Sequence, residues 1–212
     1  MKAPQRAFSA LKKISLPPLK YDYGDLAPVF SARAVELHHK IHHQAYVDKY
    51  NMAVDAFMLH SGKGNNEMAH KALTIKEFGY GGYSNHILFF DALTPVRSAG
   101  PPNKGPLLTA INQSFGDLNT FIKMFSQAAS EIKGSGWCWL ARNPFTSALS
   151  IAITHNQCTL GPLNLDPMLG IDMWEHTFYP NYEADKATFL KEIWKIVDWK
   201  VVEERFNSPS VY

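Results

Sequence analysis

The stretch Asp172-Met173-Trp174-Glu175-His176 restricts the fold and the chemistry of this 212-residue chain more than any other. If Asp172 ends a strand and the chain turns at once, its carboxylate and the imidazole of His176 reach the same metal ion. Nearer the N-terminus, the chain carries a paired-histidine run, His38-His39-Lys40-Ile41-His42-His43. A carboxylate and an imidazole four residues apart are common by chance, so this pair alone suggests a metal site but does not establish one.

The composition predicts a folded protein. Hydrophobic residues make up 46% of the chain, with 13 Phe, 9 Tyr and 5 Trp, and 212 residues are enough for one large domain or two small layers that share a core. The net charge is +2, and no stripe of Lys and Arg alternates with aromatic residues, so we expect no nucleic-acid partner. No apolar stretch is long enough to cross a bilayer, so we expect no membrane partner.

Cys138 and Cys158 are the two cysteines of the chain. Their spacing gives neither a disulfide framework nor a metal-thiolate pattern. We therefore predict two reduced thiols in a reducing compartment.

Residues 1–15 differ from the rest of the chain in composition. They contain basic residues but no acid, and their apolar residues suit one face of a helix. This composition fits a short mitochondrial targeting segment, and it also fits the basic tail of a cytosolic enzyme. We therefore expect a mitochondrial matrix protein, with a cytoplasmic location as the alternative.

Residues 16–95 are predicted to form a domain of two long helices. Ser31 is the predicted N-cap of the first helix, in which apolar and histidine positions recur every three or four residues. A turn signal at residues 61–66 separates it from a second helix that runs to about Leu93. We expect this second helix to be interrupted near residues 79–82, and the pair to form a helical hairpin.

Residues 106–206 are predicted to form a second domain, after a linker at residues 95–106 that is rich in Pro and Gly. An apolar stripe predicts a helix over residues 106–131. Beyond it the pattern predicts three strands and a last helix, at residues 137–141, 148–153, 168–172 and 187–198. The fold class is therefore α+β, with an N-terminal long helical hairpin and a C-terminal three-stranded antiparallel sheet flanked by helices.

Taken in order along the chain, the motifs resemble the iron/manganese superoxide dismutase family. The resemblance extends from Leu16 to about Arg205, and that family has the same α+β architecture. Each motif alone is weak, but the ordered set is specific. The set comprises Leu16-Pro17-Pro18-Leu19-Lys20-Tyr21-Asp22-Tyr23, Leu37-His38-His39, Gly81-Gly82-Tyr83-Ser84-Asn85-His86, Gly134-Ser135-Gly136-Trp137, Asn156-Gln157, the run from Gly170 to His176, and Ile193-Trp194-Lys195-Ile196-Val197-Asp198-Trp199.

The resemblance implies one metal ion and four protein ligands, His38, His86, Asp172 and His176. Three imidazoles and one carboxylate suit a divalent or trivalent first-row metal and leave room for solvent or substrate. The family carries a glutamine either four residues before the second ligand, where this chain has Gly82, or on the sheet, where it has Gln157. The second arrangement is typical of the manganese type, so we expect manganese, with iron as the alternative.

The resemblance also implies roles for residues around the metal. Gln157 is expected to hydrogen-bond a solvent ligand, Tyr46 to bond Gln157 and help relay protons, and His42 to lie near the substrate entrance. Judged without the resemblance, Gln157 would be a solvated loop amide and Tyr46 a core residue. The expected pocket walls, which are ordinary core residues in either case, are Trp137, Trp139 and Trp174.

The family interface implies two contacts across a two-fold axis. Glu175 is expected to reach His176 of the partner subunit, and His42 to bond the partner's Tyr179. We therefore expect a homodimer or a homotetramer. The remaining histidines are expected to be packed or hydrogen-bonded (His39 and His43) or to be surface or structural residues (His60, His70 and His155).

Three positions depart from the family pattern. Phe90 stands where a Trp is usual, and Phe178 where a Tyr is usual; both changes should alter pocket packing but leave the ligands alone. Ile41 replaces a Lys found in many members. We therefore expect weaker steering of an anion, or steering by Lys40 and Lys49.

These observations predict an enzyme, a superoxide dismutase that converts superoxide to dioxygen and hydrogen peroxide at a single redox-cycling manganese ion. One alternative is an inactive structural member of the fold in a mitochondrial ribosome, which the intact ligand set argues against. The other is a non-haem iron oxygenase, but three histidines and an aspartate leave that chemistry too few open positions.

Overall fold

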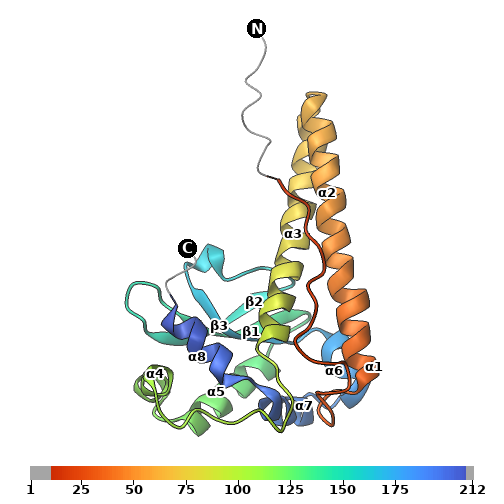
Figure 1. The fold of residues 1–212 in the computed structure, drawn as a ribbon. Helices are drawn as coiled ribbons and strands as arrows, with labels where there is room; N and C mark the ends of the chain where they lie inside the picture. Colours follow the sequence, from red (N-terminus) through yellow and green to blue (C-terminus); the bar gives the residue numbers. More distant parts are fainter. Residues whose placement is uncertain (1–10, 209–212) are drawn as a thin grey trace.

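Two long helices that run side by side dominate the N-terminal part of the computed structural model, which describes residues 11–208. Helix α1 (Ala32–Leu37), the π-helical segment η1 (His38–His43) and helix α2 (Gln44–Gly62) form one rod, and α3 (Asn66–Asp91) returns along it (Figure 1). Ser31 caps α1 as predicted, because its hydroxyl accepts the N–H of Ala34 at 3.2 Å. The predicted helical hairpin is confirmed.

The first rod is not an α-helix throughout. At the end of the histidine run, the N–H of Gln44 bonds the carbonyl of His39, five residues back. Such a π-type turn takes up one residue more than an α-helical turn and is frequent at functional sites. The three-and-four pattern of the sequence did not predict it.

Helix α3 is continuous, so the predicted interruption near residues 79–82 was wrong. A Cβ at Gly79 would lie 2.8 Å from the backbone nitrogen of Tyr50, and one at Gly82 would lie 2.3 Å from the ring of Tyr46. The glycines therefore allow α2 to approach α3 closely, and the hairpin packing outweighs their cost of about 1 kcal/mol each in a helix interior.

Two helices, α4 (Pro106–Phe115) and α5 (Leu118–Ser130), replace the single helix predicted over residues 106–131. The chain turns at Gly116, whose φ is 92°, a left-handed conformation that suits glycine. Asp117 then starts α5 by accepting the N–H of Thr120 at 2.7 Å. The apolar stripe continues across this break, which explains the incorrect prediction.

The three-stranded antiparallel sheet is confirmed. Strands β1 (Gly136–Arg142), β2 (Leu149–His155) and β3 (Asp166–Asp172) pair in the order β2-β1-β3, and all residues of the central strand are buried. A short 3-10 turn, Gly161–Leu163, lies between β2 and β3. The register places Trp137 of β1 opposite Asp172 of β3.

The chain beyond β3 forms more helices than predicted. Helices α6 (Glu175–Tyr182) and α8 (Trp199–Asn207) were not expected. The helix predicted over residues 187–198 consists of α7 (Lys186–Glu192) and a 3-10 turn, Ile193–Ile196.

Contacts with a distant part of the chain explain where this predicted helix ends. The N–H of Asp198 bonds the carbonyl of Ala92, and the N–H of Thr94 bonds the carbonyl of Ile196, both at 2.8 Å. These bonds tie the end of α3 to the end of the 3-10 turn. A local sequence pattern carries no sign of them.

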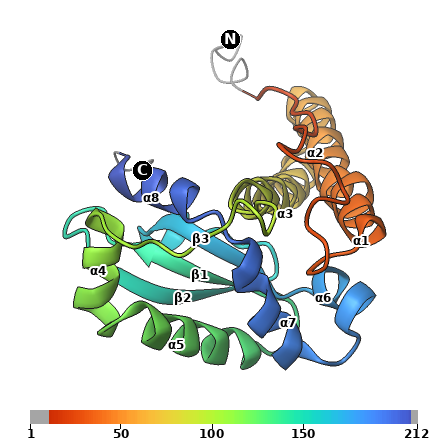
Figure 2. The ribbon, with the colours of Figure 1, turned by 60° about the horizontal axis from the view of Figure 1, so that its bottom comes forward.

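The sheet joins the hairpin to the C-terminal helices. Helix α5 packs against β1 and β2, whereas α3 and α8 pack against β3 (Figure 2). The half of α3 that carries His86 therefore lies beside the strand that ends in Asp172.

The described part of the basic N-terminal segment lies along α2. The side-chain amide of Asn51 makes two hydrogen bonds of 2.9 Å with the backbone of Ile14, and Lys13 pairs with Asp55 at 2.8 Å. The rest of the predicted targeting segment, residues 1–10, lies outside the described residues.

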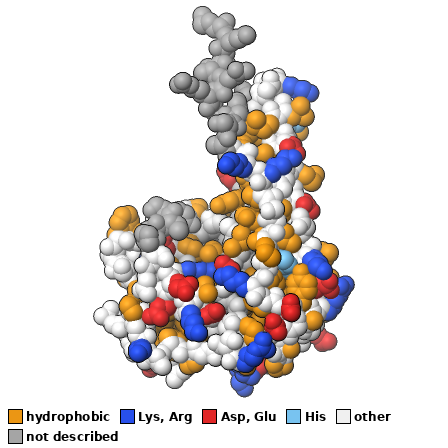
Figure 3. Space-filling model, in the orientation of Figure 1, with side chains coloured by type: hydrophobic (Ala, Val, Ile, Leu, Met, Phe, Trp, Pro, Cys, Tyr) orange, Lys and Arg blue, Asp and Glu red, His pale blue; other side chains and the backbone are white. Residues whose placement is uncertain are grey.

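Within the described part of the chain, none of the helices combines the length and the apolar character that a membrane span requires. Figure 3 shows acidic and basic side chains interspersed over the face in view. This distribution agrees with the small net charge of +2.

Candidate metal centre

Four side chains from four different elements meet at one point. His38 opens η1, His86 lies on α3, Asp172 ends β3 and His176 lies in the first turn of α6. Each offers one ligand atom, and these atoms all lie within 4.8 Å of one another. The structure therefore brings together the four residues that the resemblance implied as ligands.

The Asp172 carboxylate is at the centre of the group. Its Oδ2 lies 3.3 Å from Nε2 of His38, 3.6 Å from Nε2 of His86 and 3.3 Å from Nε2 of His176. Its other oxygen accepts the backbone N–H of Trp174 at 2.9 Å. The turn after β3 thus fixes the carboxylate so that one oxygen faces the imidazoles.

The histidine ring nitrogens at the centre are held as electron-pair donors. Nδ1 of His86 donates to the carbonyl of Gly82 at 2.6 Å, so Nε2 carries the free electron pair in the neutral ring. Nε2 of His38 and Nε2 of His86 are buried and make no hydrogen bond within the described residues. Because buried polar atoms are normally satisfied, these two nitrogens indicate that a further group belongs between them.

The environment favours the protonation states that metal ligands need. Burial lowers the pKa of His38 to about 4, although the nearby Asp172 carboxylate opposes this shift. Burial, together with the charge of His38, lowers the pKa of His86 well below its usual value. Burial alone would raise the pKa of Asp172, but the hydrogen bond and charge of His176, with lesser effects from the other two imidazoles, hold it well below its usual value.

The four residues therefore fit a metal ion. Neutral imidazoles and an ionised carboxylate are the forms that bind a cation. Electron pairs that converge from four sides repel one another unless a positive charge lies between them. The nitrogen and oxygen donors suit a first-row transition metal better than Ca²⁺ or Mg²⁺, which prefer oxygen ligands alone.

Aromatic rings enclose the ligand group. His42 stacks on His176 with a centroid distance of 4.3 Å, and Trp174 lies 5.5 Å from the same ring. Trp137 and Tyr46 each lie 5.2 Å from the ring of His86. These contacts restrict the orientation of the imidazoles.

A hydrogen-bonded chain lies beside the ligands. Nε2 of Gln157 donates to the hydroxyl oxygen of Tyr46 at 2.9 Å, and Nε1 of Trp137 donates to Oε1 of Gln157 at 3.1 Å. Gln157 follows β2 and is only 2% exposed, so it is not the solvated loop amide that its sequence position alone suggested. Trp137 is therefore a hydrogen-bond donor to Gln157, in addition to forming part of the pocket wall.

Other residues singled out in the sequence lie as follows. Trp139 stacks behind Trp137 at 5.5 Å and donates to Thr154, so it lies one layer away from the ligands. Phe90 lies 4.9 Å from the ring of His38 and forms part of the wall. Phe178 is buried and packs on Phe189.

Ile41, Glu175 and Tyr179 are exposed, and so are Lys40 and Lys49. Lys40 pairs with Glu36 at 3.0 Å. Lys49 lies with its Nζ 4.9 Å from the ring centroid of Phe78.

The remaining histidines lie outside the ligand group. His39 is buried and bonds the hydroxyl of Tyr23 and the carbonyl of Pro17, and His43 is buried and bonds the carbonyl of Tyr83. Both are thus packed and hydrogen-bonded, as expected. His60 is partly exposed, and His70 and His155 are exposed.

The sequence reasoning missed Asn85 and Gly81. Asn85 is buried next to His86, and its side chain meets the loop that carries Gln157. A Cβ at Gly81 would lie 1.9 Å from the carbonyl oxygen of Gln157. The only signal in the sequence was their position inside the motif that ends in His86.

Comparison with known families gives two matches that together span most of the chain. Residues 13–94 match the alpha-hairpin domain of iron/manganese superoxide dismutases. Residues 103–205 match the C-terminal domain of the same enzymes.

Individual relatives are similar over nearly their whole length. The mitochondrial superoxide dismutase (Mn) of Onchocerca volvulus is 40% identical over 192 residues, which cover 90% of this chain and 86% of the relative. The corresponding protein of Capsicum annuum is 40% identical over 201 residues, 93% of this chain and 88% of the relative. A superoxide dismutase (Fe) of Tetrahymena pyriformis is 38% identical over 194 residues, 89% of this chain and 97% of the relative.

Proposed function

The chain belongs to the iron/manganese superoxide dismutase family, and we propose that it converts superoxide to dioxygen and hydrogen peroxide at a single metal ion. The observation that carries this proposal is the convergence of four ligand atoms within 4.8 Å. Two of these atoms are buried nitrogens without a hydrogen bond.

Manganese is the proposed metal, with iron as the second candidate. The relatives from Onchocerca and Capsicum are named for manganese, and the one from Tetrahymena for iron. Gln157 lies two residues after the end of β2, in the arrangement typical of the manganese type, whereas a side chain at Gly82 would meet the ring of Tyr46. When bound, the metal supplies one-electron redox chemistry, by which two superoxide ions and two protons become one dioxygen and one hydrogen peroxide.

Tyr46 and Gln157 are the proposed proton-relay residues. Burial raises the pKa of Tyr46 to about 12, so its hydroxyl stays protonated at neutral pH. Because the phenol oxygen accepts a hydrogen bond from Gln157, its own O–H is free to donate to a small anion or to water. A protonated donor held beside the ligands supports proton delivery to the reduced substrate.

His42 and Trp174 are proposed to narrow the approach to the metal. Both rings contact His176, His42 by stacking and Trp174 at 5.5 Å. A narrow aromatic opening favours a diatomic anion over larger molecules. Ile41 is apolar, and Lys40 is paired with Glu36. Along the rod formed by η1 and α2, electrostatic attraction of the anion is therefore proposed to depend mainly on Lys49.

A two-fold homodimer is the proposed assembly, with a homotetramer as its extension. Glu175 and Tyr179 are exposed on α6, next to the metal ligand His176. Nε2 of His176 faces Asp172, so Nδ1 is the nitrogen left to meet Glu175 of the partner subunit. The second pair joins His42 to the partner's Tyr179.

The proposed location is the mitochondrial matrix, with the cytoplasm as the alternative. Relatives from Onchocerca volvulus and Capsicum annuum are named mitochondrial, and the basic composition of residues 1–15 fits a targeting segment. Tagging the full chain and following its distribution between cell fractions distinguishes the two locations.

The other functions considered have less support. The family matches and the named relatives do not support a structural protein of the mitochondrial ribosome. The three histidines and the aspartate exceed the two histidines and one carboxylate of a non-haem iron oxygenase.

Metal analysis combined with reloading tests the proposed function. The natively expressed chain is analysed for metal, stripped, reloaded with manganese or iron separately, and assayed for superoxide consumption. We expect one metal ion per chain and the higher activity with manganese. A fully loaded protein that is inactive with both metals would exclude the dismutase function.

A further inference from the structure

Three tyrosines form a row on the helical hairpin, outside the proposed proton relay. Tyr50 lies on α2, and Tyr80 and Tyr83 lie about one turn apart on α3. The ring centroids of Tyr50 and Tyr80 are 6.0 Å apart, and those of Tyr80 and Tyr83 are 6.3 Å apart. Both distances are typical of aromatic rings in contact.

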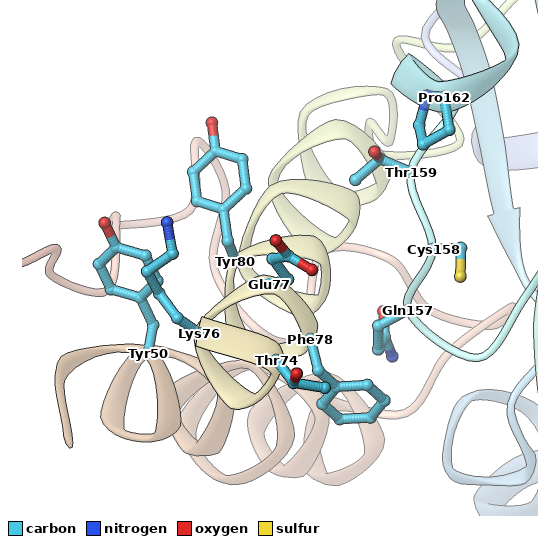
Figure 4. A pocket seen from close by; sticks show the side chains of 10 residues that line it. All are labelled: Tyr50, Thr74, Lys76, Glu77, Phe78, Tyr80, Gln157, Cys158, Thr159 and Pro162. Atoms are coloured by element: carbon cyan, nitrogen blue, oxygen red, sulfur yellow. The ribbon is translucent and has the colours of Figure 1, made fainter. Parts of the chain in front are cut away.

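Tyr50 and Tyr80 meet where the two helices approach each other closely. A Cβ at Gly79, the residue before Tyr80, would lie 2.8 Å from the backbone nitrogen of Tyr50. Both phenols line a cavity of about 510 Å³, and Figure 4 shows their hydroxyl groups projecting in the same direction. Burial and the neighbouring Tyr80 phenol raise the pKa of Tyr50, so the two hydroxyls lie within electrostatic reach of each other.

The two phenols differ in their access to solvent. Tyr80 is 49% exposed, whereas Tyr50 is 7% exposed. A one-electron oxidant in solution therefore reaches Tyr80, and Tyr50 is the partner that the fold holds against it. Reactions between groups held side by side within one chain are strongly favoured over encounters between separate molecules.

The row of tyrosines also continues inward to the candidate metal centre. Tyr83 lies 5.8 Å from the ring of His43, and its carbonyl accepts the Nε2–H of His43 at 3.1 Å. His43 in turn stacks on the proposed ligand His86 at 5.2 Å. Successive ring contacts therefore connect His86 to the half-exposed phenol of Tyr80.

We propose that Tyr50 and Tyr80 form an oxidative cross-linking site, at which hydrogen peroxide, the product of the proposed reaction, couples the two phenols into a dityrosine. Each phenol gives up one electron and one proton, and a carbon–carbon bond forms between the ring positions next to the two hydroxyls. The hydrogen displaced at each of these positions moves to the phenol oxygen. Hydrogen peroxide accepts the two electrons and two protons and becomes two water molecules.

The source of the oxidant rests on the proposed function, whereas the pairing of the two phenols does not. The metal, when bound, supplies the one-electron chemistry. Electrons from the pair reach the centre through Tyr83 and His43. The tyrosines thus act as electron donors that spare the ligand imidazoles, and the cross-link joins α2 to α3.

Two oxidations of the full-length protein separate these two statements. In the first, the metal-free protein is exposed to a photochemically generated one-electron oxidant in solution. In the second, the protein loaded with manganese or with iron is treated with hydrogen peroxide. Dityrosine fluorescence, the mass of the intact chain and peptide mapping identify the product.

We expect both oxidations to give a single chain that is two hydrogen atoms lighter, with a cross-linked peptide that contains Tyr50 and Tyr80. Tyr50→Phe and Tyr80→Phe keep the rings but should each lose this product in both oxidations. Tyr83→Phe should keep the photochemical product and lose most of the peroxide product. Tyr23→Phe is the control, since the ring of Tyr23 contacts His39 instead of a tyrosine, and it should match the parent.

Dityrosine that forms only between chains, or none in the photochemical oxidation, would overturn the proposed site. A photochemical cross-link without any peroxide product in either loaded form would overturn hydrogen peroxide as the oxidant. If the loaded protein does not consume superoxide, the proposed function fails, and the photochemical oxidation still decides whether Tyr50 and Tyr80 couple.

Discussion

The side-chain nitrogen of Gln157 donates to the hydroxyl oxygen of Tyr46 across 2.9 Å, although the two residues lie 111 positions apart in the chain. This bond joins the loop after β2 to the first rod of the hairpin. It also places a protonated phenol beside His86, one of the four proposed metal ligands. The fold thus builds the environment of the proposed metal from both halves of the chain.

Replacing Gln157 by Ala should preserve the metal but reduce turnover. The amide lies outside the ligand group, so metal content measured by elemental analysis should stay near that of the parent. Loss of the bond to Tyr46 should lower turnover by about 10- to 100-fold. It also leaves the buried N–H of Trp137 without its acceptor, at a cost of about 1–3 kcal/mol in the free energy of unfolding.

Gln127→Ala is the matched control for this substitution, because Gln127 lies exposed on α5. It should change neither turnover nor stability appreciably. If Gln157→Ala keeps both metal and parental turnover, Gln157 has no part in the reaction.

Replacing Gly81 by Ala should displace Gln157 through the backbone. The added Cβ would lie 1.9 Å from the carbonyl oxygen of Gln157, so the loop must move. Overpacking of this kind costs about 1–3 kcal/mol, measurable by denaturant unfolding, and turnover should fall with it. Gly62→Ala is the control, since nothing lies within 4 Å of its Cβ, and equal behaviour of the two variants would contradict the close contact at Gly81.

Much of the fold could be predicted from periodicity, because each long element carries its own pattern. The hairpin, the three strands and the Ser31 cap follow from apolar spacing and local hydrogen bonds. The break at Gly116 and the end of the helix before Asp198 could not, since a continuous apolar stripe hid the first and contacts with Ala92 and Thr94 determine the second. The glycines of α3 misled the prediction because their role is packing against α2.

The ligand set could be predicted only through the order of the motifs. Spacing alone related Asp172 to His176 but gave no reason to choose His38 and His86 among the nine histidines. The roles of Asn85 and of the Trp137 indole depend on contacts between side chains of the hairpin, the sheet and the loop after β2. A local sequence pattern does not predict these long-range contacts.

Replacing Glu175 by Ala should weaken the dimer and disturb the metal site together. If Glu175 reaches Nδ1 of His176 in the partner subunit, its loss leaves a ring N–H without an acceptor in each subunit, at about 1–3 kcal/mol each. Sedimentation over a dilution series, with metal analysis on the same samples, measures both effects. Glu131→Ala, which removes another exposed acid at the end of α5, is the control. Unchanged dimerisation with full metal content in Glu175→Ala would place the interface elsewhere.

The two thiols should differ sharply in reactivity. Burial raises the pKa of Cys138 to about 12, whereas Cys158 is exposed. The protonated Cys138 thiol contributes stability that is fully present below its ordinary pKa and is lost as the pH rises toward 12. A thiol reagent at mildly alkaline pH should therefore label only Cys158 in the folded chain. After denaturation it should label both cysteines.

Cys158→Ser identifies the reactive thiol in this experiment. The folded variant should take up no label, and the denatured variant should take up one. Rapid labelling of both cysteines in the folded parent would show that Cys138 is accessible.

Superoxide consumption by the manganese-loaded chain, measured beside His86→Ala, tests the central claim most directly. Three remaining ligands should not hold the ion, so the variant should lose metal and activity together. The parent should bind one manganese ion per chain and should remove superoxide in proportion to protein concentration, with dioxygen and hydrogen peroxide formed in equal amounts. A His86→Ala protein with full metal content and parental activity, or a loaded parent no faster than free manganese, would contradict the account.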